Sequence, residues 1–175
     1  WLGIAAERPF IGNGYYHPVN WRKRLDFGTG TFGDMGCHIY DPLFKALALT
    51  SPLSVRSEGP APGVHNWTTD AVVHYVFPGT PFTEGSTVKV TWYDGDQRPP
   101  KGIQKLLKVE PDSRFRPAPP PASARKGRKK EIAPQIRGEF RELPPQGSIF
   151  IGTKGIMLLP HIAKPELFPE KQYED

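Results

Sequence analysis

The chain has 175 residues, of which 37% are hydrophobic and 23% are charged, with 21 Pro, 18 Gly and a net charge of +5. Its 10 Phe, 6 Tyr and 4 Trp exclude a wholly disordered polymer, and its length fits one domain of ordinary size. No stretch approaches the about 20 consecutive apolar residues of a membrane-spanning helix. The single cysteine, Cys37, excludes an internal disulfide.

The first part of the chain predicts a loop followed by a helix. Residues 1–27 are rich in aromatic and turn-forming residues. From Thr31 to about Leu49, apolar residues recur at helical spacing. They are Phe32, Met35, Ile39, Leu43, Ala46 and Leu47. Pro42 lacks a backbone donor, so we expect it to kink the helix or to end it at Asp41.

The segments after Ser51-Pro52 have the pattern of strands, with runs of β-branched and aromatic residues between turn residues. These runs are Leu53–Val55, Val72–Phe77, Thr87–Tyr93, Ser148–Ile151 and Gly155–Leu159. Strand and helix do not alternate strictly. The sequence therefore predicts an α+β domain with one main helix packed on an open, mostly antiparallel sheet.

The positive charge is confined to residues 97–146, which hold thirteen Lys and Arg against five Asp and Glu, a net of +8. The rest of the chain has a net charge of −3. The segment also holds ten of the 21 prolines, so we interpret it as an exposed insertion. Lys126–Lys130 could bind phosphates or an acidic partner. Interleaved aromatic residues are absent there, and we therefore expect no nucleic-acid partner.

The stretch Gly28-Thr-Gly-Thr-Phe-Gly33 satisfies the G-x-G-x-x-G pattern of a dinucleotide-binding turn. It does not follow a buried apolar strand, and residues 46–57 hold no acidic residue that could bind the ribose. We therefore expect these glycines to permit close backbone approach, or unusual backbone angles, where the loop enters the helix.

A carboxylate and an imidazole lie one turn apart at the start of the predicted helix. At 100° per residue, Asp34, His38 and Asp41 share one face, roughly opposite the apolar stripe. The imidazole can exchange a proton near neutral pH and the carboxylate can orient it. Two structural alternatives stay open: Asp34 as the third-position carboxylate of a helix capped by Thr31, and His38 on a merely solvated face. A metal site lacks a clear further ligand set, and we expect none.

The stretches Asn20-Trp-Arg22 and Asp26-Phe-Gly-Thr-Gly-Thr-Phe-Gly-Asp-Met-Gly-Cys-His-Ile-Tyr-Asp-Pro42 resemble the substrate-domain signature of the glucose-fructose oxidoreductase, inositol dehydrogenase and rhizopine catabolism protein family (Gfo/Idh/MocA). Thr91-Trp-Tyr-Asp-Gly95 and Phe150-Ile-Gly-Thr-Lys-Gly155 resemble its sheet strand and closing strand-turn. The resemblance implies an NAD- or NADP-dependent oxidoreductase acting on a hydroxyl of a sugar, polyol or related compound. The cofactor would be bound mainly by an N-terminal Rossmann domain that this chain lacks.

The resemblance also implies roles for single residues. His38 matches the family's acid/base and Asp34 the carboxylate that assists it. The loop before them offers stacking faces and hydrogen-bond donors for a carbohydrate-like substrate. These candidate substrate-binding residues are Tyr16, His17, Trp21 and Arg22. Cys37 is expected to be a small buried residue rather than a nucleophile.

The family's Glu-Lys-Pro motif is missing, since Lys164-Pro165 follows Ala163. We therefore expect the C-terminal portion of a longer enzyme, inactive alone. Residues 1–96 and 147–162 would form the family-like domain, 97–146 the insertion and 163–175 a tail. A homo-oligomer would form through the sheet face. The compartment stays open: cytoplasmic or, if an export signal precedes Trp1, periplasmic.

The alternative is a non-catalytic binding or oligomerisation module derived from that domain. The reading frame upstream of Trp1 distinguishes the two hypotheses. A glycine fingerprint and a Glu-Lys-Pro motif there would favour the enzyme, and an immediate start codon would favour the module.

Overall fold

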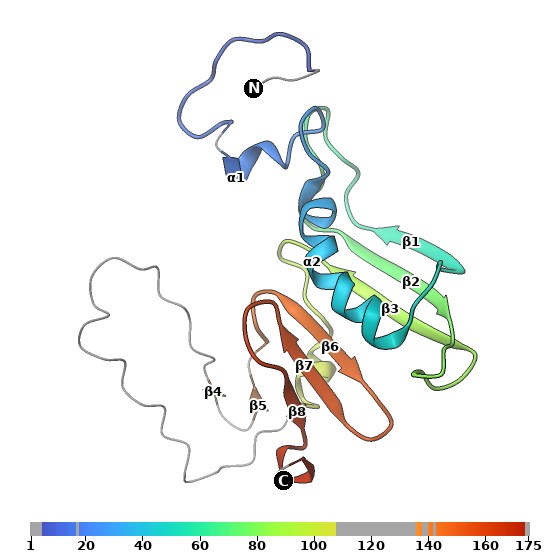
Figure 1. Cartoon of the computed structure of the whole chain (residues 1–175). Helices are drawn as coiled ribbons and strands as arrows, with labels where there is room; N and C mark the ends of the chain where they lie inside the picture. The colour runs from blue at the N-terminus through green and yellow to red at the C-terminus, as the bar shows by residue number, and fades with distance from the viewer. Residues whose placement is uncertain (1–4, 17, 108–135, 138–139, 142, 174–175) are drawn as a thin grey trace, which may run out of the picture. The chain divides into compact units, whose positions relative to one another are not determined.

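The computed structural model describes residues 5–16, 18–107, 136–137, 140–141 and 143–173 (Figure 1). The chain divides into two compact units, Trp1–Pro99 and Pro100–Asp175, and each is described by itself. Most of the basic segment, including Lys126–Lys130, lies outside the described residues.

Helices and antiparallel sheets occur in both units, which confirms the α+β class. The first unit contains α1 (Pro18–Trp21), α2 (Gly30–Leu47), β1 (Ser54–Glu58), β2 (Val72–Pro78) and β3 (Thr87–Tyr93). The second contains α3 (Lys101–Gln104), β4 (Ile136–Arg137), β5 (Phe140–Arg141), β6 (Gly147–Ile151), β7 (Ile156–Pro160), β8 (Glu166–Phe168) and a 3-10 turn, η2 (Glu170–Gln172). The five predicted strand runs are confirmed as β1, β2, β3, β6 and β7.

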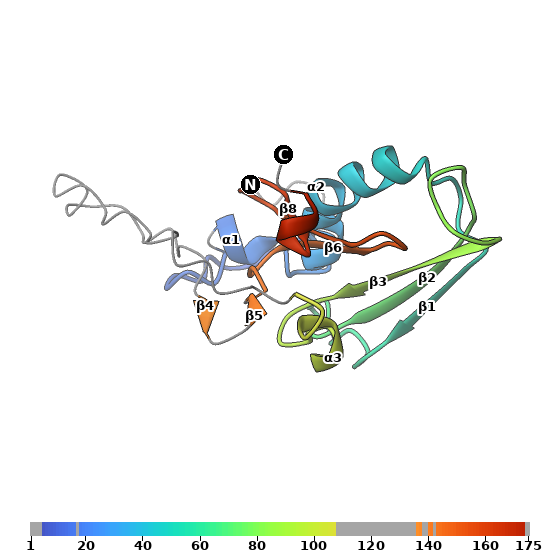
Figure 2. The ribbon, with the colours of Figure 1, turned by 90° about the horizontal axis from the view of Figure 1, so that it is seen from below.

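The first unit is built around a three-stranded antiparallel sheet in the order β1-β2-β3 (Figure 2). In the β2–β3 pair, Val73 lies opposite Trp92 and Tyr75 lies opposite Val90. Alternate residues of a strand share a face, so Tyr75, Phe77 and Trp92 point to the same side of the sheet. That side carries large aromatic side chains, and Phe77 is almost fully buried.

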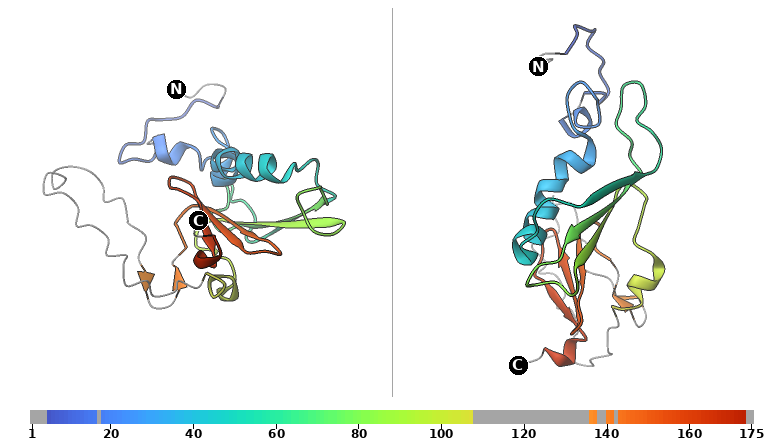
Figure 3. Two further views of the ribbon diagram at one scale, coloured as in Figure 1. Left: turned by 60° about the horizontal axis from the view of Figure 1, so that its bottom comes forward. Right: turned by 90° about the vertical axis from the view of Figure 1, so that its right-hand side faces the viewer.

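Helix α2 packs on this aromatic side of the sheet (Figure 3). The Tyr40 ring stacks on Trp92 with centroids 5.7 Å apart, and Phe44 meets Phe77 edge-on at 5.4 Å. Aromatic pairs of this kind stabilise a fold by about 0.5–1.5 kcal/mol each beyond the area that they bury. The helix is therefore oriented by its aromatic residues.

The helix face that contacts the sheet differs from the predicted stripe. Tyr40 and Phe44 contact the sheet although the stripe omits them, whereas Ala46 of the stripe is exposed. Phe32 belongs to both sets and meets Trp92 at 5.0 Å. Because Phe32, Tyr40 and Phe44 are spaced by multiples of four, they share a face with the buried Gly36.

The ends of α2 also correct the sequence analysis. The helix continues through Pro42 to Leu47, so the predicted break at Asp41 is wrong. Ala48 is the residue that caps this end. Its φ of 50° is left-handed, and its N–H donates to the carbonyl of Phe44. At the other end the cap position is held by Thr29 rather than Thr31, without a side-chain cap hydrogen bond. Asp34 is therefore the fifth helical residue, and its reading as a third-position cap carboxylate is wrong.

The second unit is an antiparallel sheet in the order β6-β7-β8. Its core consists of the buried residues Leu107, Leu158 and Phe168, with Leu143, Ile149 and Ile156 packed against them. The turn between β6 and β7 is held by the C-terminal segment, since Tyr173 Oη donates to the Lys154 carbonyl at 2.8 Å. Gln172 Nε2 donates to the same oxygen at 3.0 Å.

The second unit changes two boundaries that the sequence suggested. Leu107 and Leu143, from the segment read as an exposed insertion, are part of its core. Residues Glu166–Phe168, from the segment read as a tail, form β8 beside β7. Both segments contribute apolar residues, Leu107, Leu143 and Phe168, that pack against Leu158 and Ile149 of the β6–β7 hairpin. The joining of 147–162 to residues 1–96 stays a prediction.

The buried phenol of Tyr40 yields a first testable prediction. Burial raises its pKa, and burial also raises the pKa of Tyr75. The folded state then holds these protons more tightly, so the stability is fully present below pH about 10 and is lost as pH rises through the raised values. Above pH 10 we expect the free energy of unfolding to fall by up to about 1.4 kcal/mol per pH unit for each proton involved.

Urea titrations between pH 8 and 11, followed by tryptophan fluorescence, measure this slope. All four tryptophans lie in the first unit, at positions 1, 21, 67 and 92. The substitution Tyr40→Phe should flatten the alkaline slope because the variant has one buried phenol fewer. Equal slopes for Tyr40→Phe and the parent chain would contradict the assignment.

Candidate functional site

The face of α2 that points away from the sheet carries the predicted Asp34 and His38. Asp34 is half-buried, and His38 and Asp41 are exposed. The aromatic contacts of Phe32 and Tyr40 determine this orientation, since they occupy the opposite face. The helix therefore presents the carboxylate and the imidazole one turn apart on its outer face.

Asp34 is held by an arginine from the preceding loop. Arg22 Nη1 lies 2.5 Å from Asp34 Oδ2, with side-chain exposures of 32% and 25%. At this partial exposure the pair is worth about 0.2–1 kcal/mol, so its main effect is to fix the position of the carboxylate. Both residues are candidates from the sequence, but Arg22 was expected to bind the substrate, and its pairing with Asp34 was not predicted.

The space where side chains would lie on the glycines of the G-x-G-x-x-G stretch is filled by other atoms of the chain. A Cβ on Gly28 would lie 2.5 Å from the Arg22 backbone, and Gly30 has a φ of +72° with Trp67 at 3.0 Å from the position of its Cβ. The prediction of close approach and unusual backbone angles is thus confirmed. The backbone N–H groups of Gly28, Gly30 and Gly33 donate to carbonyls of the chain itself, so the stretch does not fit a dinucleotide-binding turn, in which such groups bind the pyrophosphate.

The loop of residues 65–67 is bound to the loop that precedes α2. Leu25 N–H donates to the His65 carbonyl at 3.0 Å, and Trp67 N–H donates to the Lys23 carbonyl at 2.9 Å. The Trp67 indole Nε1 donates to the Gly28 carbonyl at 2.7 Å. Two segments more than 35 residues apart in sequence therefore form one rigid surface beside the start of α2.

An open depression of about 280 Å³ lies on this surface. Its lining consists of Asn20, Lys23, Arg24, Asn66, Trp67 and Thr69. The loop 20–24 thus contributes to two features: Arg22 turns to Asp34, while its neighbours line the depression. Arg22, which holds Asp34, is thus the chain neighbour of a residue that lines the depression.

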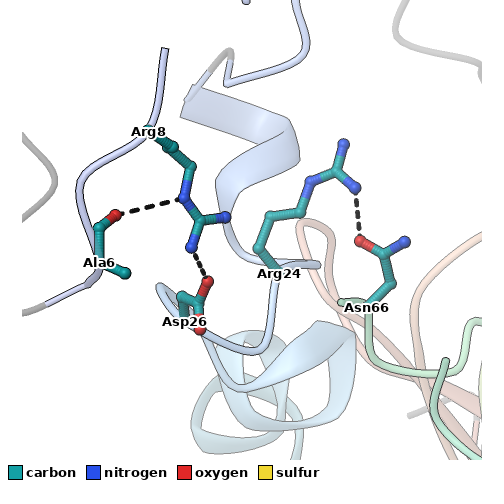
Figure 4. Close-up of polar contacts among 5 residues, drawn as sticks. All are labelled: Ala6, Arg8, Arg24, Asp26 and Asn66. Carbon is teal, nitrogen blue, oxygen red and sulfur yellow. Dashed lines mark hydrogen bonds and ion pairs between the residues drawn. The ribbon is translucent and has the colours of Figure 1, made fainter. Parts of the chain in front are cut away.

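Arginine contacts shape this loop (Figure 4). Arg24 Nη1 donates to Asn66 Oδ1 at 2.5 Å, and its guanidinium lies over the Tyr15 ring at 3.9 Å from the centroid. Arg8 forms an ion pair with Asp26. Together these contacts attach the N-terminal loop to the turn that leads into α2.

The other predicted substrate-binding residues have different environments. Tyr16 is buried, with its ring 4.7 Å from Tyr15 and 6.0 Å from Phe27, so it packs within the loop. Trp21 is the half-buried last residue of α1. His17 lies outside the described residues. The structure thus brings Arg22 to Asp34 and places Tyr16 in a local aromatic cluster.

Four residues that line the depression were not predicted from the sequence. They are Lys23, Arg24, Asn66 and Trp67. The basic run Arg22-Lys-Arg24 was a signal for the first two. No local pattern connects them to residues 66 and 67, because that contact depends on long-range pairing. Cys37 was expected to be buried, and this is wrong: it is exposed. The sheet-facing neighbour is Gly36, and successive helical residues point about 100° apart.

The described part of the chain contains neither a metal site nor a membrane-spanning helix. Within it, no group of three or more His, Cys, Asp or Glu side chains is placed to hold a metal ion. No helix among the same residues is long and apolar enough to cross a membrane.

A scan against protein-family models found no match to this chain, and a search of curated proteins found none either. The resemblance to the Gfo/Idh/MocA family therefore rests on the motifs themselves.

The close packing at the start of α2 makes Gly30→Ala a direct test of this geometry. A side chain there meets both the left-handed φ and the Trp67 contact, so we expect a loss of about 1–3 kcal/mol in the free energy of unfolding. Gly36→Ala is the matched control, because nothing lies within 4 Å of its Cβ position. In the helix interior it should gain up to about 1 kcal/mol. Urea unfolding measures both, and equal effects would contradict the account.

Proposed function

We propose that the first unit is the substrate-binding, part-catalytic portion of an NAD(P)-dependent oxidoreductase that acts on a hydroxyl of a sugar, polyol or related compound. One observation carries the proposal: α2 presents Asp34 and His38 one turn apart, away from the sheet, with Asp34 held by Arg22 at 2.5 Å. The loop motifs that resemble the Gfo/Idh/MocA family support it.

His38 takes the proton from the substrate hydroxyl and returns it in the reverse reaction. An exposed imidazole is suited to this, because its nitrogen must come within hydrogen-bond reach of the substrate oxygen. Asp34 acts as a positioning residue for His38 and for the substrate. Its pairing with Arg22 holds the carboxylate in one orientation.

The cofactor, NAD or NADP, would accept the hydride and would be bound mainly by a domain outside this chain. The turn at residues 28–33 supports this division, because the N–H groups of its three glycines donate to carbonyls of the chain itself. The chain contributes the proton-transfer residues and the substrate-facing loop.

The proposal extends to the architecture. In it, α2 and the open sheet β1-β2-β3 form the substrate domain, the basic Pro-rich part of residues 97–146 is an insertion, and the Rossmann domain belongs to a longer chain. The sheet face not covered by α2 would form a homo-oligomer interface. It carries the polar network of Arg56, Glu58, His74 and Thr91.

Kinetics of the intact protein containing this chain test the role of His38. His38→Ala should lower kcat for NAD(P)-linked oxidation of the substrate by about 10²–10⁴-fold, the usual worth of general acid/base catalysis. The reduced cofactor is followed by absorbance with a panel of sugars and polyols. Far-ultraviolet circular dichroism should stay unchanged, because the side chain is exposed.

His161→Ala, a histidine of the second unit, is the matched control and should keep the parent kcat. An unchanged kcat in His38→Ala would remove the histidine from the mechanism. If no sugar, polyol or related compound reduces either cofactor, the oxidoreductase proposal is wrong.

A further inference from the structure

The depression beside α1 has an unbalanced charge. Its lining contains the two cations Lys23 and Arg24, two amides, a threonine and an indole, and no carboxylate. Within the described part of the chain, neither Lys23 nor Arg24 forms an ion pair. The carboxylate of Asp26 is instead paired with Arg8. The lining therefore carries two positive charges and no carboxylate.

The side chains of Arg24, Asn66 and Trp67 are held before any ligand binds. Arg24 donates to Asn66, as Figure 4 shows, and its guanidinium lies over the Tyr15 ring. Its Nε is buried without a hydrogen-bond partner among the described groups. Trp67 is fixed by its bonds to Lys23 and Gly28. Preorganised groups lose little conformational entropy when a ligand binds.

The far wall is fixed in a similar way. Thr69 Oγ1 donates to Asp70 Oδ2 at 3.1 Å, and Asp70 Oδ1 accepts the Asp96 N–H at 2.9 Å. Both oxygens of the Asp70 carboxylate accept hydrogen bonds, and Asp70 is not among the residues that line the depression. The wall presents hydroxyl and amide groups, which suit the hydroxyls of a small polar ligand.

We propose that this depression binds a small acidic carbohydrate, with Lys23 and Arg24 on its carboxylate or phosphate and the Trp67 indole along its ring. Cations supply charge-assisted hydrogen bonds to an anion, and a planar indole suits the apolar face of a sugar. Asn20 Nδ2 already donates to the Gly14 carbonyl and Asn66 Oδ1 accepts from Arg24, so Asn20 Oδ1 and Asn66 Nδ2 are the amide groups proposed to meet ring hydroxyls. The substrate of the proposed enzyme is therefore an acidic sugar derivative rather than a neutral polyol.

The identification of this ligand as the substrate rests on the proposed function, whereas the binding itself does not. Calorimetry on the 175-residue chain at low salt tests the binding directly, with D-glucuronate, D-glucose 6-phosphate and D-glucose as probes. At least one of the two anions should bind about fivefold or more tightly than D-glucose, as expected for partly exposed charges. The anion that binds more tightly shows whether the carboxylate or the phosphate is preferred.

Lys23→Gln should weaken binding of the preferred anion about threefold to fivefold and leave D-glucose binding unchanged, because Lys23 is exposed and contributes chiefly its charge. Lys45→Gln is the matched control: it removes one positive charge from the last turn of α2, outside the depression. It should leave anion binding unchanged. Raising the salt concentration should reduce the preference for the anion.

Equal affinity for all three probes, or no binding of any, overturns the proposal. An equal loss of anion affinity in Lys23→Gln and Lys45→Gln also overturns the proposal. It would show that the anion responds to the net charge of the chain and not to a site at Lys23. None of these measurements involves hydride transfer. Failure of the oxidoreductase proposal therefore appears in the kinetics of His38→Ala, and failure of this one appears in the calorimetry.

Discussion

The stacking of Tyr40 against Trp92 and the edge-on contact of Phe44 with Phe77 determine how α2 is rotated on the sheet. The rest of the first unit depends on that rotation. With these rings toward the sheet, the face one half-turn away carries Asp34 and His38 to the outside. A rotation that centred the predicted stripe on the sheet would turn Tyr40 and Phe44 away from Trp92 and Phe77, and these aromatic contacts favour the observed rotation.

A second constraint is the close approach of the loops before α2. Gly28 admits the Arg22 backbone and Gly30 admits Trp67, so the chain turns back on itself directly before the helix begins. This turn brings the Arg22 side chain to Asp34. It also places Lys23 and Arg24 beside Asn66 and Trp67. The glycines that match the pattern of a dinucleotide fingerprint thus shape the candidate site, because they let the loops before α2 pack closely.

The division of charge in this region has a chemical logic. Asp34 and Asp26 each have an arginine partner, Arg22 and Arg8. Lys23 and Arg24 have no ion-pair partner among the described residues, and both line the depression. In our proposals, Asp34 and His38 serve proton transfer, and Lys23 and Arg24 serve the binding of an anion.

Local patterns were sufficient for much of this protein. The strand runs, the position of α2 to within two residues, the α+β class and the common face of Asp34 and His38 follow from spacing along the chain. The sequence also indicated that the glycines at 28–33 serve close approach. It misplaced the end of the helix at Pro42, since the packed aromatic face stabilises the helix on both sides of the proline.

Only the tertiary structure decided which face of α2 meets the sheet, which residue holds Asp34, and which distant loop completes the depression. These are contacts between segments that lie far apart in the chain: Tyr40 with Trp92, and Lys23 with Trp67. Helical and strand periodicity describe neighbours a few residues apart and carry no information on such pairs. The sequence alone determined the elements and the shared face of Asp34 and His38, and long-range packing turned them into a site.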